Sequence, residues 1–312
     1  MRSILRELGA GQAGVFTSAQ AAGLGFDSRA LSGLVREQAV VRLGRGMFAV
    51  PDPILETAQG RHRALARAAL LRYPDAALDG ASALVAEGIP MWSVPLKRAW
   101  LNRAVLDHEV LTQSLVLRPR RGTVHVSPDG PRADIATALV LHTLDHGMMA
   151  GVVAMDHALR VGLVDRATLA EAARRAHGWP RSSMLTAALS HVDPGAESAP
   201  ETVVRVLLAT AGLELTTQFP ILSPSSGQPF AFADLRVDGT NLLLEIDGLV
   251  KYSAGNRSGL APSEVVIAEK RREDRIRRLG WLVERLIVRE IVTPGLVVRR
   301  VRRALAGVDR VA

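Results

Sequence analysis

Hydrophobic and polar positions change their spacing several times in the last third of the chain. Residues 229–237 and 241–246 are short apolar runs that predict two β-strands, and Asp238-Gly239 between them is typical of a hairpin turn. Residues 263–279 then have apolar positions at helical spacing, and residues 281–288 predict another buried strand. We therefore expect a sheet with helices beside it in this part of the chain.

The first fifty residues show a different pattern, in which short helices are followed by a hairpin. Thr17 can cap a short helix over residues 18–22, and Asp27 can cap a longer one over residues 28–37. Apolar stretches on both sides of Gly44-Arg45-Gly46 predict two short strands. This order is that of a winged helix-turn-helix, in which the second helix enters the major groove of DNA. We expect Leu31, Leu34 and Val35 of that helix to face inward.

The middle of the chain is predicted to be mainly helical, with short strands near residues 98–102 and 123–126. Stretches rich in Pro, Gly and Ser mark its limits. We expect an α+β or α/β multidomain protein with three domains, a winged helix (1–53), an α-rich connector (54–192) and a mixed sheet flanked by helices (193–312). The expected middle helices cover Ala58–Tyr73, Ala81–Glu87, Ala133–Asp145, Met148–Val161 and Thr168–Ala176.

Composition narrows the class of protein. A length of 312 residues is enough for two or three domains, each with its own core. A net charge of +8 fits a polyanionic partner, although an arginine-rich proteome gives the same signal. The absence of cysteine excludes disulfides, thiolate zinc sites and cysteine nucleophiles. Since no run of about eighteen apolar residues and no signal-peptide pattern occurs, we expect a soluble cytoplasmic protein without membrane contact.

Histidines in the middle region resemble a metal motif only superficially. His142 and His146 are four residues apart on one helical face, with His157 further on and Asp145 and Asp156 nearby. An H-x-x-x-H pair needs a further ligand and usually a catalytic Glu, which this sequence does not place between them. We interpret these histidines as packing or capping residues.

Candidate chemistry is concentrated in the C-terminal part, where Asp234, Glu245, Asp247 and Lys251 lie within eighteen residues. Glu245 and Asp247 point the same way because side chains alternate along a strand, and the hairpin brings Asp234 beside Glu245. Three carboxylates at one point oppose joint ionisation unless a cation lies between them. We therefore predict a Mg²⁺ or Mn²⁺ site with Asp234, Glu245 and Asp247 as ligands. The alternative is an acidic hairpin that decorates the surface.

This arrangement resembles the PD-(D/E)XK nuclease superfamily, and more closely the branch related to very-short-patch repair endonucleases, over about residues 197–290. The resemblance implies a restriction-endonuclease-like fold and metal-dependent hydrolysis of DNA. By this match, Glu201 corresponds to the glutamate of the first core helix and supports the metal shell. Asp234 corresponds to the first strand aspartate, and Glu245 to the second acidic ligand.

One position departs from the superfamily pattern, because Asp247 stands where the E-x-K lysine would be. Asp247 would then bind metal or orient water. Lys251 is the first candidate for a migrated lysine that stabilises the transition state, and Lys270 is the second.

A basic helix follows the acidic cluster. Residues 269–278 contain six Lys or Arg against three acidic residues, and guanidinium groups suit phosphate oxygens. The alternative is a solvated helix with ion pairs at i,i+4 spacing. Counting both ends of the chain, the residues expected to contact DNA are Ser28, Arg29, Ser32, Arg36, Arg42, Arg45, Lys270, Arg271 and Arg275.

The first fifty residues resemble the N-terminal winged-helix domain of AbiEi-type antitoxins of type IV toxin–antitoxin systems, whose role is to bind DNA and repress their own promoter. The resemblance implies DNA and a toxin as partners and a host-defence context; a winged helix that mediates protein contacts is the alternative. Two functions follow. One is a DNA-binding protein with a Mg²⁺-dependent endonuclease domain, and the other is a non-enzymatic repressor or antitoxin with an inactive nuclease fold.

Overall fold

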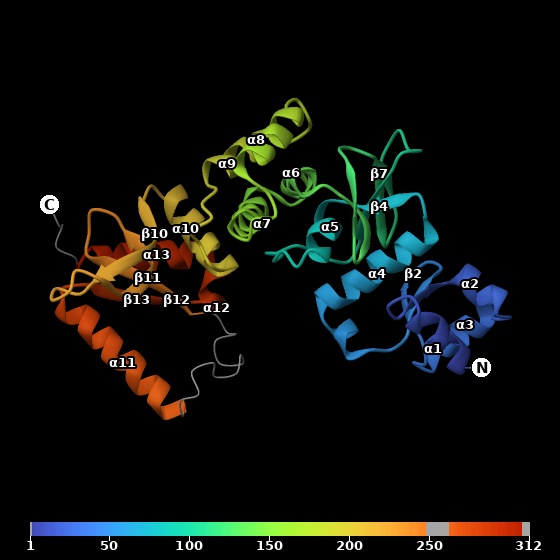
Figure 1. Ribbon diagram of the computed structural model, residues 1–312, viewed down its shortest axis with the longest axis horizontal. Helices are drawn as coiled ribbons and strands as arrows, with labels where there is room; N and C mark the ends of the chain where they lie inside the picture. The colour runs from blue at the N-terminus through green and yellow to red at the C-terminus, as the bar shows by residue number, and fades with distance from the viewer. Residues whose placement is uncertain (1, 248–261, 308–312) are drawn as a thin grey trace. The chain divides into compact units, whose positions relative to one another are not determined.

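The computed structural model describes residues 2–247 and 262–307 (Figure 1). The chain divides into two compact units, Met1–Ser190 and His191–Ala312. The boundary lies next to the expected one after residue 192. The winged helix and the expected middle domain both belong to the first unit, so the division into three domains stays a prediction.

The first unit begins with a three-stranded antiparallel sheet and three helices. The sheet order is β1-β3-β2, and Phe16 of β1 stacks on Phe48 of β3 with 5.7 Å between ring centroids. The expected helices and hairpin are present, and α1 and β1 add to them. The elements are α1 (Arg2–Ala10), β1 (Val15–Thr17), α2 (Ser18–Gly23), α3 (Ser28–Arg36), β2 (Val41–Gly44) and β3 (Met47–Ala49).

The rest of the first unit contains a six-stranded mixed sheet in the order β6-β7-β5-β4-β9-β8. The expected helices are present and the region is mainly helical, as predicted, but its sheet is larger than expected, because four strands of two to five residues were missed. The elements are η1 (Pro53–Glu56), α4 (Ala58–Arg72), β4 (Ala76–Leu78), α5 (Gly80–Ala86), β5 (Ala99–Arg103), β6 (Val110–Leu111), β7 (Leu115–Pro119), β8 (Val124–Ser127), β9 (Gly130–Ala133), α6 (Ile135–His146), α7 (Met148–Arg160), α8 (Arg166–Arg175) and α9 (Ser182–Ser190).

The second unit has a four-stranded mixed sheet in the order β10-β11-β12-β13. The first three strands pair antiparallel, and β13 is parallel to β12. Ile276 of α11 packs on Ile221 and Leu243 of the sheet, while α10 and α13 pack on each other (Figure 1). The elements are α10 (Ala199–Thr210), β10 (Leu215–Leu222), β11 (Pro229–Val237), β12 (Leu242–Asp247), α11 (Pro262–Arg278), β13 (Leu282–Ile287), α12 (Val288–Ile291) and α13 (Pro294–Leu305).

Two glycines form the tight turns that place the candidate residues. Gly46 in the β2–β3 turn has φ +72°, and Gly239 in the β11–β12 turn has φ +70°. This left-handed conformation favours glycine over residues with a Cβ atom. Within the described ranges, every helix is too short or too polar to cross a membrane.

Candidate functional site

Helix α3 presents a polar, basic face to solvent. Its apolar positions Leu31 and Leu34 are buried in the core of the N-terminal module, as the helical spacing predicted. The residues expected to contact DNA lie on the other side, where Ser28, Arg29 and Arg36 are exposed and Ser32 is half-buried. Side chains on this face are free of the core.

The start of α3 is fixed by a side-chain cap. Asp27 Oδ1 accepts a hydrogen bond from Ala30 N at 2.7 Å, and its backbone is extended as an N-cap requires. In the preceding helix, Thr17 and Gln20 form a capping box. Both caps agree with the sequence prediction, and they determine where α2 and α3 begin.

The wing lies beside α3. Arg42 Nη2 donates to Ser32 Oγ at 3.5 Å, and the Arg42 guanidinium lies 5.2 Å from the centroid of the Phe48 ring. Arg45 is exposed at the tip, and its carbonyl oxygen accepts a hydrogen bond from Arg72 Nη1 at 2.6 Å. Because Arg72 belongs to α4, the wing is tied to the next domain as well as to α3.

A hollow of about 770 Å³ continues the basic surface beyond the wing. It is formed by the wing, the first turn of α4, the segment 94–97 and residues 113–114, and none of its described lining residues is acidic. Arg61 Nη2 donates to the carbonyl oxygen of Arg42 at 3.0 Å, which joins α4 to the wing. Four basic side chains line it, all of them exposed: Arg42, Arg45, Arg61 and Lys97.

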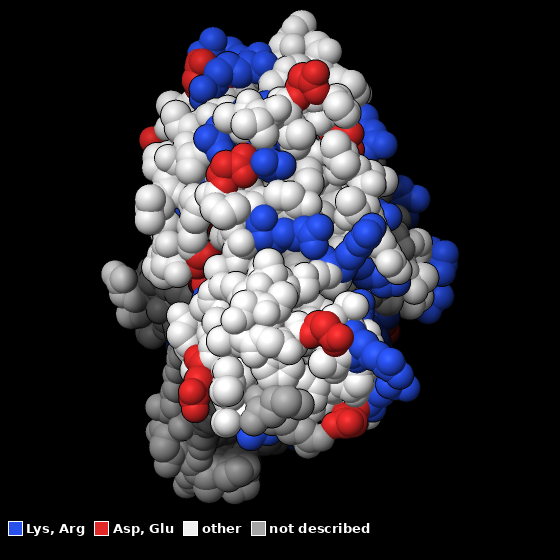
Figure 2. Space-filling view, turned by 90° about the vertical axis from the view of Figure 1, so that its right-hand side faces the viewer, with Lys and Arg blue, Asp and Glu red and all other residues white. Residues whose placement is uncertain are grey.

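Arg61 and Lys97 were not predicted from the sequence. Helix α4 contains several arginines, but Arg63 donates to the carbonyl oxygen of Val85 and Arg67 pairs with Asp129. Only the fold distinguishes Arg61, which faces the wing, from these structural arginines. Figure 2 shows one face of the molecule on which Lys and Arg outnumber Asp and Glu.

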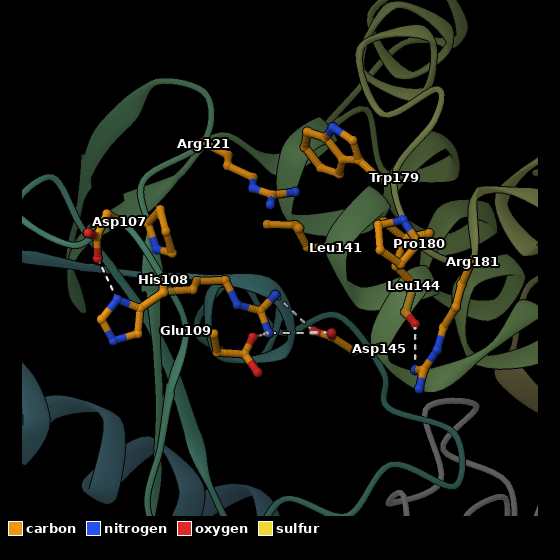
Figure 3. A pocket seen from close by; sticks show the side chains of 12 residues that line it. Asp107, His108, Glu109, Arg121, Leu141, Leu144, Asp145, Trp179, Pro180 and Arg181 are labelled. Atoms are coloured by element: carbon orange, nitrogen blue, oxygen red, sulfur yellow. Dashed lines mark hydrogen bonds and ion pairs between the residues drawn. The ribbon is translucent and has the colours of Figure 1, made fainter.

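A second pocket, of about 460 Å³, lies between β7, α6 and the turn at Trp179 (Figure 3). The buried Arg118 pairs with Asp145 at 3.1 Å and with Glu109 at 3.2 Å, and its Nε atom lies 3.8 Å from Asp79. Burial raises the pKa of Asp79 to about 6. Arg121 lies over the ring of Trp179 at 3.9 Å. The charges in this pocket compensate one another, and the sequence pointed to no chemistry here.

The histidines of the middle region pack, as predicted. The ring of His142 lies 4.9 Å from that of His146, which contacts Trp100 edge-on at 5.1 Å. Burial lowers the pKa of His142 to about 3. His157 accepts from Arg160 at 3.2 Å. A neutral imidazole in such an apolar environment is a packing group.

Three acidic residues of the second unit lie close together where β11 runs beside the end of β12. Glu245 is 9 % exposed, and Asp234 Oδ2 accepts a hydrogen bond from Ile246 N at 2.6 Å. Burial raises the pKa of Glu245, although Arg272 and Arg285 lower it; the negative charges of Asp234 and Asp247 raise it further. The three carboxylates therefore lie close enough together for their negative charges to interact.

Arginines neutralise this cluster. Glu245 Oε1 accepts from Arg272 Nη2 at 3.0 Å, and its Oε2 lies 3.3 Å from Arg285 Nη2. Asp247 Oδ2 lies 3.6 Å from Arg285 Nη1. Among the described residues, no three His, Asp or Glu side chains are grouped so that they could hold a metal ion. As they stand, these residues do not fit a resident Mg²⁺ or Mn²⁺ ion.

The other predicted catalytic residues have different surroundings. Glu201 accepts hydrogen bonds from Glu197 N at 2.8 Å and from Ser198 Oγ at 2.7 Å, which are contacts of the cap that begins α10, and from Gln218 Nε2 of β10 at 3.4 Å. Lys251 lies outside the described residues.

On α11, Lys270 and Arg271 are exposed, as expected of residues that contact DNA. Arg275 donates to Ser223 Oγ at 2.9 Å and lies 3.9 Å from the centroid of the Phe230 ring. The i,i+4 ion pair Glu273–Arg277 is present at 2.8 Å. Some of the charged residues of α11 thus pair with each other, as expected for a solvated helix.

Residues 3–51 match the model of a family described as transcriptional regulator, AbiEi antitoxin. The N-terminal module is therefore an AbiEi antitoxin-like transcriptional regulator domain, and the match includes α2, α3 and the wing. No curated protein matches the chain significantly. The family match ends far before the acidic cluster, so the nuclease fold and activity stay predictions.

Proposed function

We propose that this protein is a DNA-binding transcriptional regulator of the antitoxin type. The observation that carries the proposal is the coincidence of the family match at residues 3–51 with an exposed basic surface on α3 and the wing. A helix that presents arginines beside a basic wing suits a polyanionic duplex.

In the proposed complex, α3 enters the major groove. Ser28, Arg29 and Ser32 in its first turns face the base edges, where an Arg can donate two hydrogen bonds to guanine. Arg36 at the end of the helix and Arg42 on the wing contact phosphates, which fix the orientation of the protein without specifying sequence. Arg45 at the tip of the wing adds a further phosphate contact.

The hollow behind the wing extends this interface. Arg61 and Lys97 project into the same space as Arg42 and Arg45, and no carboxylate competes for them among the described lining residues. We assign these four side chains to a continuous phosphate path. A toxin encoded with the regulator is the proposed protein partner, and this rests on the antitoxin-like domain alone.

A second candidate function is Mg²⁺-dependent cleavage of DNA by the second unit. It is supported by the mixed four-stranded sheet and by the closeness of Asp234 and Asp247 to Glu245, whose pKa their negative charges raise. It is disfavoured by the arginines that neutralise Glu245 and Asp247. Glu201 as a supporting residue and Lys251 as a transition-state stabiliser belong to this candidate, as do Lys270, Arg271 and Arg275 as contacts to the DNA backbone.

The DNA-binding proposal is tested by fluorescence anisotropy with the duplex from upstream of the protein's own coding sequence and with a scrambled duplex. We expect Arg29→Ala to weaken specific binding by about 1–3 kcal/mol, because it removes a base contact. Arg175→Ala, at an exposed arginine of α8, is the matched control and should bind as the wild type does. Equal affinity of the wild type for both duplexes, unchanged by Arg29→Ala, would refute sequence-specific binding.

The cleavage candidate needs a separate assay, because binding and hydrolysis can fail independently. Supercoiled plasmid and single-stranded DNA are incubated with the protein in Mg²⁺, Mn²⁺ or EDTA, beside the Asp234→Ala/Glu245→Ala variant. Metal-dependent cutting that the variant lacks supports the nuclease. Retained binding without any cutting leaves the regulator as the function.

A further inference from the structure

The two parallel strands of the second unit bring opposite charges to one face. Glu245 of β12 is paired in register with Arg285 of β13, and Asp247 follows two residues later on the same face. Helix α11 lies between these strands in the chain and contributes Glu269 and Glu273, one helical turn apart. All four carboxylates point toward the same arginine.

Arg285 contacts each of these carboxylates. Its Nη2 atom lies 3.3 Å from Glu245, 3.1 Å from Glu269 and 3.0 Å from Glu273. Its Nη1 atom lies 3.6 Å from Asp247. A guanidinium group has five N–H donors in a fixed plane, so one arginine can serve several carboxylates at once.

Glu245 is satisfied on both sides. Arg272 of α11 holds Oε1 at 3.0 Å, and Arg285 of β13 lies at Oε2. The Glu245 side chain is 12 % exposed, and a carboxylate this far from water needs a compensating positive charge. That charge comes from the chain itself.

A divalent cation at this place would compete with Arg285 for the same oxygens. Mg²⁺ requires direct oxygen contacts at about 2.0–2.1 Å in octahedral geometry. A guanidinium at hydrogen-bond distance from those oxygens blocks this geometry and repels a second positive charge. The two cations are therefore mutually exclusive.

We propose that Arg285 is the resident counter-ion of this acidic cluster, and that removing its charge opens a divalent-cation site on Glu245 Oε2 and Asp247 Oδ2, the oxygens that face Arg285, while Arg272 keeps Glu245 Oε1. The inference is independent of the DNA-binding function proposed for the N-terminal module. It bears on the second candidate, because Arg285 in the wild-type chain keeps Mg²⁺ and Mn²⁺ out of this cluster.

The test is isothermal titration of the full chain with MnCl₂, together with thermal unfolding with and without Mn²⁺. The variants are Arg285→Gln, which removes the charge, and Arg285→Lys, which retains it. A double variant, Arg285→Gln/Glu245→Gln, removes the acceptor as well. We expect Arg285→Gln to bind Mn²⁺ at least about tenfold more tightly than the wild type. The Arg285→Lys and double variants should behave as the wild type does.

Two results would overturn the inference. One is saturable binding of Mn²⁺ to the wild-type chain that is lost in the single variant Glu245→Gln, titrated beside the others. The other is a folded Arg285→Gln variant whose Mn²⁺ affinity is no greater than that of the wild type. Should Arg285→Gln be unfolded without metal, recovery of its circular dichroism by Mn²⁺ supports the counter-ion role, and failure to recover contradicts it.

Discussion

Single side chains determine how α3 is placed and what it presents. Asp27 holds the first turn through its hydrogen bond to Ala30 N, while its neighbour Ser28 is exposed and turned outward. On the wing, Arg42 connects to α3 through Ser32. Asp27 therefore stabilises the start of the helix, whereas its neighbour Ser28 is proposed to contact DNA.

The Asp27→Ala variant separates these roles. We expect it to lower the free energy of unfolding by about 1 kcal/mol, because a helix N-cap is lost. Ser28→Ala should leave stability unchanged and affect DNA binding alone. Urea unfolding followed by circular dichroism measures both; equal stability of Asp27→Ala and the wild type would show that the cap contributes little.

The sequence predicted the exposed and buried sides of α3, because a helical repeat fixes which residues share a face. It did not predict the role of Arg285, which stands next to Glu284 in β13 and belongs to no recognised motif. Its partners lie on another strand and on α11, and only the parallel register brings them together. Lys251, predicted as catalytic, remains untested because it lies outside the described residues.

Among the elements, long helices were predicted well and short strands poorly. Helices α4, α6 and α7 begin and end within about two residues of their predicted limits, since twelve or more residues give a clear periodicity. Strands β4 and β6 have three and two residues, too few for an alternating pattern to be recognised. Their pairing depends on distant segments, which a local pattern does not contain.

Helices α4 and α6 each bury a histidine in the first unit. Burial lowers the pKa of His62 to about 4 and that of His142 to about 3. In the unfolded chain the pKa is near its ordinary value of about 6.5. Since the folded pKa is lowered, the neutral side chains stabilise the fold above pH 6.5, and this contribution is lost as the pH falls below that value.

We therefore expect the stability of the first unit to fall between pH 7 and pH 5, by about 2 kcal/mol for each of these histidines. His142→Leu should reduce the loss by about that amount, because leucine takes up no proton. Thermal unfolding of both proteins across this range measures the difference, and Asp79 titrates equally in both. Parallel pH profiles for the two proteins would show that His142 is not protonated on unfolding.

At the scale of the whole molecule, the chain joins an antitoxin-like regulator domain to a second unit with its own mixed sheet and core. The net charge of +8 suggested a polyanionic partner, and the fold shows where part of that charge is displayed. Arg61 and Lys97 lie beyond the family match and line the same hollow as the wing arginines. The proposed DNA interface is thus larger than the matched domain.

The double variant Arg61→Ala/Lys97→Ala tests this extension. We expect it to weaken binding to specific and scrambled duplexes alike, because phosphate contacts read no sequence. The slope of log K against log salt concentration should become less negative by about 1.8, since about 0.9 is lost for each contact. Anisotropy titrations at several salt concentrations give the slope, with Arg174→Ala as an exposed control on α8. An unchanged slope would remove the hollow from the interface.

The most direct test of the central claim is transcription from the promoter upstream of the protein's own gene, measured with a fused reporter. Cells produce the wild-type chain or the Arg29→Ala/Arg42→Ala variant at equal protein levels. We expect the wild type to repress the reporter, whereas the variant, folded by circular dichroism, does not. Repression by both proteins, or by neither, would contradict a regulator that acts through α3 and the wing.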